Sequence, residues 1–310
     1  MTIGGIDLVV LIASLMVAST PILLAAIGEL IAEKSGVLNL GVEGMMIMGA
    51  ICGFVAAVHS GSPVVGFVGG ALGGTAMALL FAFLTQILLS NQVATGLALT
   101  LFGLGLSALI GQGYNGVRPP QTDNLNFGPL TQIPVLGPIL FQHDWVVYLS
   151  LALVAGTWAV LRYSRVGLIL RAVGENHDAA HALGYRVRTV RTLALMFGGA
   201  CAGMGGAYIS LVRVPQWSDG MTAGAGWIAL AIVVFASWRP WRVLLGAYIF
   251  GGVTVLQLRL QAAGIAIPVQ ILSMAPYLIT ILVLVIMSAR RGRAAIGAPA
   301  SLGRIFHASS

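Results

Sequence analysis

The sequence has few charged side chains. Only 8% of its 310 residues are Asp, Glu, Lys or Arg, whereas a soluble domain carries about 25%. Hydrophobic residues make up 58% of the chain, and the mean hydropathy is +0.96. So few charges disfavour both a soluble globular protein and a disordered chain. The composition indicates an all-α polytopic protein in a lipid bilayer.

Cysteine is also scarce. Cys52 and Cys201 lie in apolar runs, far from any Cys or His at ligand spacing, which gives no support to a disulfide framework or a zinc site. We expect both to be small buried helix residues. The net charge of +7 would suggest a nucleic-acid partner only if the cations shared one solvated face, and they are spread along the chain. We therefore predict no nucleic-acid binding, no metal site and no cofactor.

The sequence lacks a catalytic constellation. An intramembrane hydrolase would need paired aspartates, a Ser-His pair or an HExxH helix inside the spans. His177 and His181 are spaced like metal ligands on a helix, but no third ligand is evident. A phosphate-binding P-loop is missing too, because the only lysine, Lys34, follows Glu33. We predict that the chain is not an enzyme. The five histidines fall in predicted loops or in the tail: His59, His143, His177, His181 and His307.

Long apolar runs are abundant. A bilayer crossing takes about 20 residues, and runs bounded by charge, Pro or Gly clusters predict about nine transmembrane helices, with eight to ten as the range. The first run has no preceding Lys or Arg, so we interpret it as a membrane helix and not as a secretory signal. The span at 225–238 is short and could be half-inserted. The nine are 7–27, 41–58, 66–90, 92–110, 145–161, 192–211, 225–238, 243–261 and 268–289.

Arginine placement predicts the orientation. Lys and Arg accumulate in cytoplasmic loops, and nine spans put most of the cations on one side of the membrane. We expect the N-terminus outside and the C-terminus in the cytoplasm. An eight- or ten-span chain would move the N-terminus without disturbing the arginine-rich loops. The cations on that side are Lys34, Arg162, Arg165, Arg171, Arg186, Arg188, Arg191, Arg239, Arg242, Arg290, Arg291, Arg293 and Arg304.

The chain divides into one transmembrane domain (1–289) and a tail (290–310). The outer loop 111–144 contains five prolines, which predicts turns and short irregular structure. The tail is rich in Gly, Ala, Ser and Arg, and we expect it to be disordered in the cytoplasm. Glycines one helical turn apart predict close helix packing in the membrane domain. They are Gly49/Gly53, Gly66/Gly70/Gly74 and Gly199/Gly203.

The loop 162–191 is the largest excursion on the arginine-rich side. Within it, Asn176 is a suitable N-cap for a short helix and Gly184 suits its C′ position. Glu175 and Asp178 complement the positive end of the helix dipole. We therefore predict a short helix over 176–184.

One face of this short helix is small and apolar. Ala179, Ala180 and Leu183 fall at helical spacing. Such a face could fit a groove on another protein. The alternative is a solvated connector whose arginines only set the topology.

Four stretches of sequence carry a family resemblance. They resemble ABC transporter permeases of the branched-chain amino acid and ribose type, and in particular the simple-sugar or nucleoside branch of that family. The likeness runs from Pro21 to about Met287. One departure is His177, where the family usually has Pro. The first stretch is RAVGENHDAAHALG (171–184), taken together with GGACAGMGGA (198–207) in the next helix; the other three are GELIAEKSGVLNLGVEGMMIMGA (28–50), NQVATGLAL (91–99) and GAGWIALA (224–231).

The resemblance implies the ABC importer permease fold and a set of partners. These are a cytoplasmic ABC ATPase that hydrolyses ATP, a second permease subunit in a heterodimer, and an extracytoplasmic solute-binding protein. It also implies a place in the bacterial plasma membrane. In such permeases the short loop helix docks in a cleft of the ATPase. The residues that match this coupling element are Gly174, Glu175, Asn176, Asp178, Ala179, Ala180, Leu183 and Gly184.

Polar residues inside or beside the spans are candidates for the solute pathway, because such groups usually face a cavity or a neighbouring helix. Uncharged donors and acceptors suit a neutral hydroxylated solute with an amide-like base. Asn39 and Glu43 lie in a Gly-rich segment that would permit a broken helix. Bonds between helices are the alternative role for each. The candidates are Asn39, Glu43, Asn91, Gln92, Thr95, Trp227 and Gln257, with Thr100, Gln270 and Ser273 as further polar positions.

The predicted function is transport of a nucleoside or simple sugar through an ATP-driven importer. The first alternative is an ion-coupled secondary transporter of a small polar solute. Such proteins commonly place carboxylates in mid-span, whereas most of the acidic residues here are peripheral. The second alternative is a branched-chain amino acid ABC permease. The residues do not distinguish nucleosides from sugars.

Overall fold

The structure is a computed structural model that describes residues 2–3, 6–262 and 297–307, together with positions 274, 278, 281, 282 and 285. The described residues form a helical bundle, as the sequence predicts. At the N-terminus, the two-residue strands β1 (Thr2–Ile3) and β2 (Ile6–Asp7) pair antiparallel. The α-helices are α1 (Leu8–Lys34), α2 (Val42–Ser60), α3 (Pro63–Ala82), α4 (Gln92–Gly111), α5 (Leu136–Leu140), α6 (Trp145–Tyr163), α7 (Arg165–Glu175), α8 (His177–Ala182), α9 (Val187–Tyr208), α10 (Ala225–Phe235) and α11 (Pro240–Ala262). The π segments η1 (Phe83–Ile87) and η4 (Ile209–Arg213) continue α3 and α9, and the 3₁₀ segments are η2 (Gln112–Tyr114) and η3 (Gly128–Gln132).

Within the described residues, 7 helices are long and apolar enough to cross a membrane. They comprise α1, α2, α3 with η1, α4 with η2, α6, α9 with η4, and α11. The short apolar helix α10 has 11 residues, which at about 1.5 Å per residue is too short to span the hydrocarbon core. Most of the predicted span 268–289, including Gln270 and Ser273, lies outside the described residues. The count of nine therefore stays a prediction.

The first span is longer than the sequence pattern indicated. We expected it over 7–27, whereas α1 continues to Lys34. Glu29 and Glu33 lie in the added turns and are 1% and 0% exposed. Each has a hydrogen-bonding partner inside the bundle, so the helix buries carboxylates that hydropathy alone assigned to a loop.

The centre of the bundle is packed through glycines. A Cβ atom on Gly203 would overlap the carbonyl oxygen of Gly70, and a Cβ on Gly49 would overlap the backbone of Gly203. Helices α2, α3 and α9 therefore approach at backbone distance, which only glycine permits. The predicted glycine pairs are confirmed as contact points.

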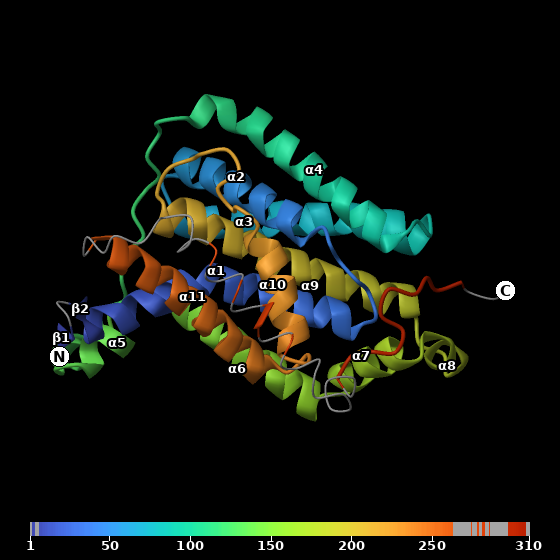
Figure 1. The fold of residues 1–310 in the computed structure, drawn as a ribbon. Coiled ribbons are helices and arrows are strands. Elements are labelled where there is room, and N and C mark those ends of the chain that lie inside the picture. Colours follow the sequence, from blue (N-terminus) through green and yellow to red (C-terminus); the bar gives the residue numbers. More distant parts are fainter. Residues whose placement is uncertain are drawn as a thin grey trace.

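The two ends of the bundle differ in content (Figure 1). β1, β2 and α5 lie at one end, and α7 and α8 lie at the other end beside the C-terminus. The loop 111–144 contains η2, η3 and α5, and beyond Tyr114 it contains no candidate span, as expected from its prolines. Helix α4 lies along the outside of the bundle, and Leu101 on it is 70% exposed. Such an apolar outer face suits lipid or another membrane subunit.

For residues 297–307 the expectation of a disordered tail is wrong. Ser301 is buried, and its amide donates to the carbonyl of Gly174 at 2.9 Å. Phe306 is 4% exposed. We name residues 297–307 the tail segment. Its order comes from backbone hydrogen bonds and one buried ring, neither of which composition reveals.

Candidate functional site: the coupling loop and the broken α1–α2 connection

The candidate coupling loop consists of α7 and α8, and Asn176 separates the two helices. Its backbone ends α7, and its side-chain Oδ1 accepts a hydrogen bond from the amide of Ala179 at 2.9 Å. Gly184 closes the loop with φ +86°, a left-handed conformation that favours glycine. The predicted N-cap and C′ residues are therefore confirmed, although α8 itself spans only His177–Ala182.

The two faces of the loop are used differently. Gly174 and Ala180 are buried, and a Cβ on Gly174 would overlap the carbonyl oxygen of Lys34 at the end of α1. Leu183 is 77% exposed, and Ala179 is exposed beside it. The expected apolar face of Ala179, Ala180 and Leu183 is thus divided, because Ala180 packs inward against Val173, Val187 and Phe306. We name the exposed residues of this loop the candidate coupling surface; they are Glu175, Asn176, Asp178, Ala179, Leu183 and Gly184.

The tail segment lies against the inner side of this loop. The hydroxyl of Ser301 donates to the carbonyl of Glu175 at 3.1 Å, and the Gly303 amide donates to the Gly36 carbonyl at 3.2 Å. The Arg304 carbonyl accepts from Arg191 Nη1 at 3.0 Å. The tail segment therefore joins α7, α9 and the connection between α1 and α2.

His177 packs inside this junction. Its ring lies 5.4 Å from that of Phe306, and its Nδ1 is 3.2 Å from Arg191 Nη2. Burial, with the charges of Arg191 and Arg304, holds the pKa of His177 below its ordinary value of about 6.5, while Asp178 opposes the shift. The neutral ring can then accept from Arg191. This packing role needs no metal ion.

Residues 35–41 form the broken connection between α1 and α2. Asn39 is fully buried; its amide donates to Glu29 Oε2 at 3.1 Å, and its Oδ1 accepts from the Gly41 amide at 3.1 Å. Gln92 Oε1 accepts from the Leu38 amide at 2.8 Å, and the Thr100 hydroxyl donates to the Leu40 carbonyl. Asn39 and Gln92 are thus engaged with backbone and side-chain groups of the protein.

The Glu43 carboxylate accepts hydrogen bonds from groups at the start of α10. Its Oε1 accepts from the Thr222 hydroxyl at 2.6 Å and the Gly224 amide at 2.9 Å, and its Oε2 accepts from the Gly226 amide at 2.6 Å. These amides lie at the start of α10, where the helix dipole favours a negative charge. Glu43 therefore caps a helix that begins inside the bundle.

The other pathway candidates do not converge. Asn91 is exposed and caps α4 by accepting from the Ala94 amide, and the Thr95 hydroxyl lies 2.9 Å from that of Ser90. Trp227 is 48% exposed, and Gln257 on α11 is half-buried.

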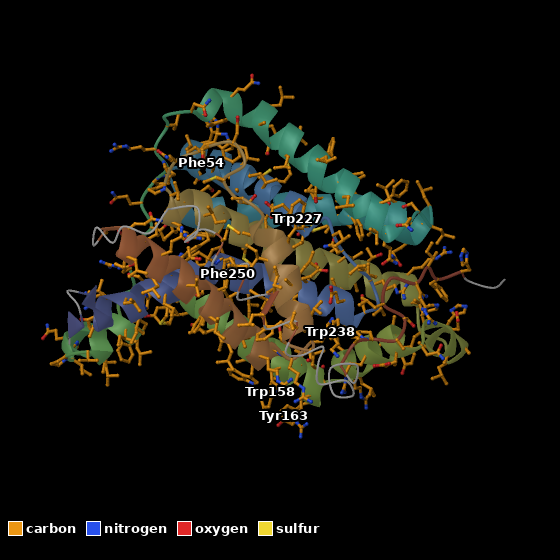
Figure 2. The ribbon with its side chains drawn as sticks, in the orientation of Figure 1. Phe54, Trp158, Tyr163, Trp227, Trp238 and Phe250 are labelled. Atoms are coloured by element: carbon orange, nitrogen blue, oxygen red, sulfur yellow. The ribbon has the colours of Figure 1, made fainter. Side chains whose placement is uncertain are left out.

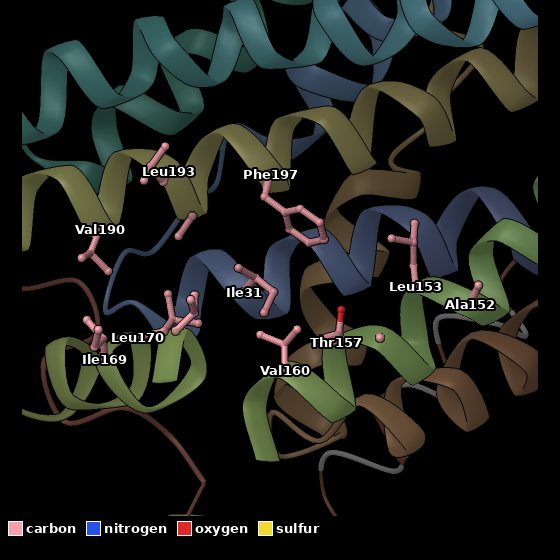
Figure 3. A pocket seen from close by; sticks show the side chains of 13 residues that line it. Ile31, Ala152, Leu153, Thr157, Val160, Ile169, Leu170, Val190, Leu193 and Phe197 are labelled. Atoms are coloured by element: carbon pink, nitrogen blue, oxygen red, sulfur yellow. The ribbon is translucent and has the colours of Figure 1, made fainter. Parts of the chain in front are cut away.

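A cavity of about 550 Å³ opens between α1, α6, α7 and α9. Figure 3 shows Ile31, Thr157 and Phe197 around it, and apolar side chains dominate its lining. None of the seven pathway candidates lines it. Its chemistry suits hydrocarbon better than a hydroxylated solute.

Sequence reasoning missed Glu29 and Glu33. Glu29 Oε1 and Glu33 Oε1 are buried and have no hydrogen-bonding partner in the part of the chain that is described. Trp238 Nε1 donates to Glu33 Oε2. The available signal was two glutamates one helical turn apart, directly after an apolar run.

A bundle of long apolar helices, with one structured loop at the arginine-rich end, is the architecture of a multi-pass membrane protein. Residues 11–289 match the family described as "Branched-chain amino acid transport system / permease component". The chain belongs to this family of ABC transporter permeases.

Relatives over the full length support this assignment. The chain is 42% identical over 307 residues to the "Putative glucose ABC transporter permease protein TsgC13" of Haloferax volcanii. This alignment covers 92% of this chain and 93% of that protein. It is 33% identical over 289 residues to the nucleoside ABC transporter permease protein NupC of Lactococcus lactis subsp. cremoris, covering 89% and 91%. A solved ABC transporter in an inward-facing conformation, described as metal-chelate type, matches with a TM-score of 0.50 and 18% identity over 91% of this chain and 87% of that one. At that identity the solved structure supports the fold alone.

Proposed function

We propose that this permease is a subunit of an ATP-driven importer in a bacterial plasma membrane and that its solute is a nucleoside or a simple sugar. The observation that carries the proposal is the full-length similarity to permeases named for glucose and for nucleosides. A nucleoside contains a sugar, so both solutes are neutral and rich in hydroxyl groups. Uncharged polar side chains can bind such solutes without a desolvated charge.

The coupling surface of α7 and α8 would bind a separate ABC ATPase. Gly174 and Ala180 fix the loop on the bundle, while Asp178, Ala179 and Leu183 point away from it. The buried residues hold the loop firmly on the bundle, and the exposed leucine is available to a partner protein. This geometry suits the transmission of a closing movement of the partner to α1 and α9. The ATP chemistry would then occur entirely on that partner.

Three further assignments belong to this proposal. The arginine-rich end would face the cytoplasm, together with the C-terminus. A second permease would complete a heterodimer, and a solute-binding protein would deliver solute at the opposite end. For the pathway we keep Asn91, Thr95, Trp227 and Gln257, because these side chains are exposed or half-buried, whereas Asn39, Glu43 and Gln92 are held by the bonds described above.

The test is a double substitution on the coupling surface. Glu175→Gln with Leu183→Ser should lower ATP-driven uptake at least about tenfold, because a lost docking surface costs more than about 1.4 kcal/mol of binding free energy. Uptake and ATP hydrolysis are measured in proteoliposomes that contain the ATPase and the binding protein. ATP hydrolysis should continue without solute stimulation.

The matched control is Asp123→Asn with Leu125→Ser in the outer loop, where both side chains are also exposed. This control should keep normal uptake. Unchanged uptake in the coupling-surface variant contradicts the coupling assignment. Solute movement without nucleotide that collapses with ionophores supports the ion-coupled alternative instead.

A further inference from the structure

A second cavity lies at the arginine-rich end, at the point where α1 and α6 end and α11 begins. Its volume is about 640 Å³, and we name it the basic pocket. Four separate elements contribute cations to it. The cationic lining residues are Lys34, Arg162, Arg171, Arg239 and Arg242.

The described residues do not balance the positive charge of the basic pocket. Among the described residues, none of its five cations forms a salt bridge within 4.0 Å. Lys34 Nζ donates to the carbonyl of Gly297 at 2.9 Å, and the nearby carboxylates are Glu33 and Glu175. Two carboxylates against five cations leave a net positive charge, so the basic pocket attracts anions.

Topology and helix dipoles explain only part of this charge. Lys34 and Arg162 lie at the C-terminal ends of α1 and α6, where a cation stabilises the helix dipole. Arg239 and Arg242 lie at the N-terminal end of α11, where a cation opposes the dipole. An anion bound between them would offset this unfavourable interaction.

Tryptophans place the basic pocket at the depth of the lipid headgroups. Trp158, Trp238 and Trp241 line it, and Trp158 and Trp241 are 36% and 47% exposed. Figure 2 shows Trp158, Tyr163 and Trp238 gathered at this end of the molecule. Tryptophan is enriched where membrane helices leave the hydrocarbon core, and α1, α6 and α11 are all candidate membrane helices.

We propose that the basic pocket binds the phosphate headgroup of an anionic phospholipid from the leaflet on the arginine-rich side. Basic pockets between transmembrane helices at this depth are suited to such headgroups. Arg239 and Arg242 hold the phosphate from the α11 side, and Arg162 and Arg171 hold it from the α6–α7 side. The exposed rings of Trp158 and Trp241 contact the glycerol region.

The test compares phosphatidylglycerol with phosphatidylcholine of the same acyl chains on the full-length protein. Retained lipid is counted by native mass spectrometry after detergent exchange. The wild type should retain phosphatidylglycerol in preference to phosphatidylcholine. The double variant Arg239→Gln with Arg242→Gln should bind phosphatidylglycerol about 30-fold more weakly.

The matched control is Arg186→Gln with Arg188→Gln, which removes two exposed arginines at the start of α9, outside the basic pocket. This control should retain phosphatidylglycerol like the wild type. Folding is checked by the elution profile and melting temperature without added lipid. If the Arg239/Arg242 variant fails this check, Arg162→Gln with Arg171→Gln replaces it, with the same expected loss.

Four outcomes overturn the proposal. Equal losses in the pocket and control variants mean that binding follows overall charge. Equal retention of the two lipids means that the headgroup charge is not recognised. Stabilisation by inorganic phosphate that matches phosphatidylglycerol, or loss of ATPase binding in the pocket variant with lipid retention unchanged, assigns the basic pocket to a soluble anion or to the partner protein.

Discussion

Two groups of buried carboxylates lie close together in the sequence, and their surroundings differ. Glu43 is 3% exposed, and its two oxygens accept from three donors. Glu29 and Glu33 are equally buried, but each accepts through one oxygen and leaves the other without a partner among the described residues. Burial alone does not separate the two groups. The number of hydrogen-bond donors separates them. Glu43 uses both oxygens to hold the start of α10, whereas Glu29 and Glu33 each keep one oxygen available to accept a further hydrogen bond.

The comparison is tested most strongly by Glu43→Gln. The new side-chain amide would direct an N–H toward one of the three donor groups. These two donors would then lack an acceptor, which should lower the free energy of unfolding by about 2 kcal/mol. For a chain of this size we expect the melting temperature to fall by about 5 °C. Thermal unfolding of the purified full-length protein in detergent measures the change.

Glu29→Gln is the matched control for this prediction. Its Oε2 accepts from a single donor, the Asn39 amide, and replacing a poorly paired buried charge by a neutral group is often close to neutral. The melting temperature should therefore stay within about 1 °C of the wild type. A loss in Glu29→Gln as large as that in Glu43→Gln would remove the distinction between the two groups.

Asn39→Leu sharpens the comparison at Glu29. It removes the donor to Glu29 Oε2 and the acceptor for the Gly41 amide, which should cost about 1.5 kcal/mol. In a Glu29→Gln background the cost should be smaller, because no buried carboxylate loses its donor. A double-mutant cycle of melting temperatures measures the difference. If the effects of Asn39→Leu and Glu29→Gln are fully additive, Asn39 stabilises the protein only through its hydrogen bond to the Gly41 amide.

Among the three destabilising substitutions, Trp238→Phe should have the smallest effect. It keeps the buried ring and removes the Nε1 donor to Glu33, which should cost about 1 kcal/mol. Thermal unfolding again gives the measurement, with Trp241→Phe as the control on an exposed ring. A Trp238→Phe protein as stable as the control would mean that Glu33 does not depend on this bond.

The features that the sequence predicted well are local in the chain. Asn176 and Gly184 define the ends of the short loop helix by their own backbone preferences, and Gly203 marks a helix contact by its spacing from Gly199. The family was also predictable, because its motifs are continuous segments. Each of these signals requires only neighbouring residues.

The features that were missed depend on distant residues. Glu33 is buried because Trp238 reaches it from a segment about two hundred positions later, and the tail segment is ordered by carbonyl and amide groups of Gly174 and Gly36. Composition cannot show such partners. The same reason explains why Asn39 and Glu43 were considered for the pathway, since an engaged and a free polar residue look alike in sequence.

The order of the tail segment bears on the timing of biogenesis. Ser301, Gly303 and Arg304 bond to residues that leave the ribosome more than a hundred positions earlier. The base of α7 and the α1–α2 connection therefore obtain these partners only after residues 301–304 have been synthesised, long after α1 and α2. A chain that stops before residue 297 would leave the carbonyl groups of Gly36 and Gly174 without these hydrogen bonds.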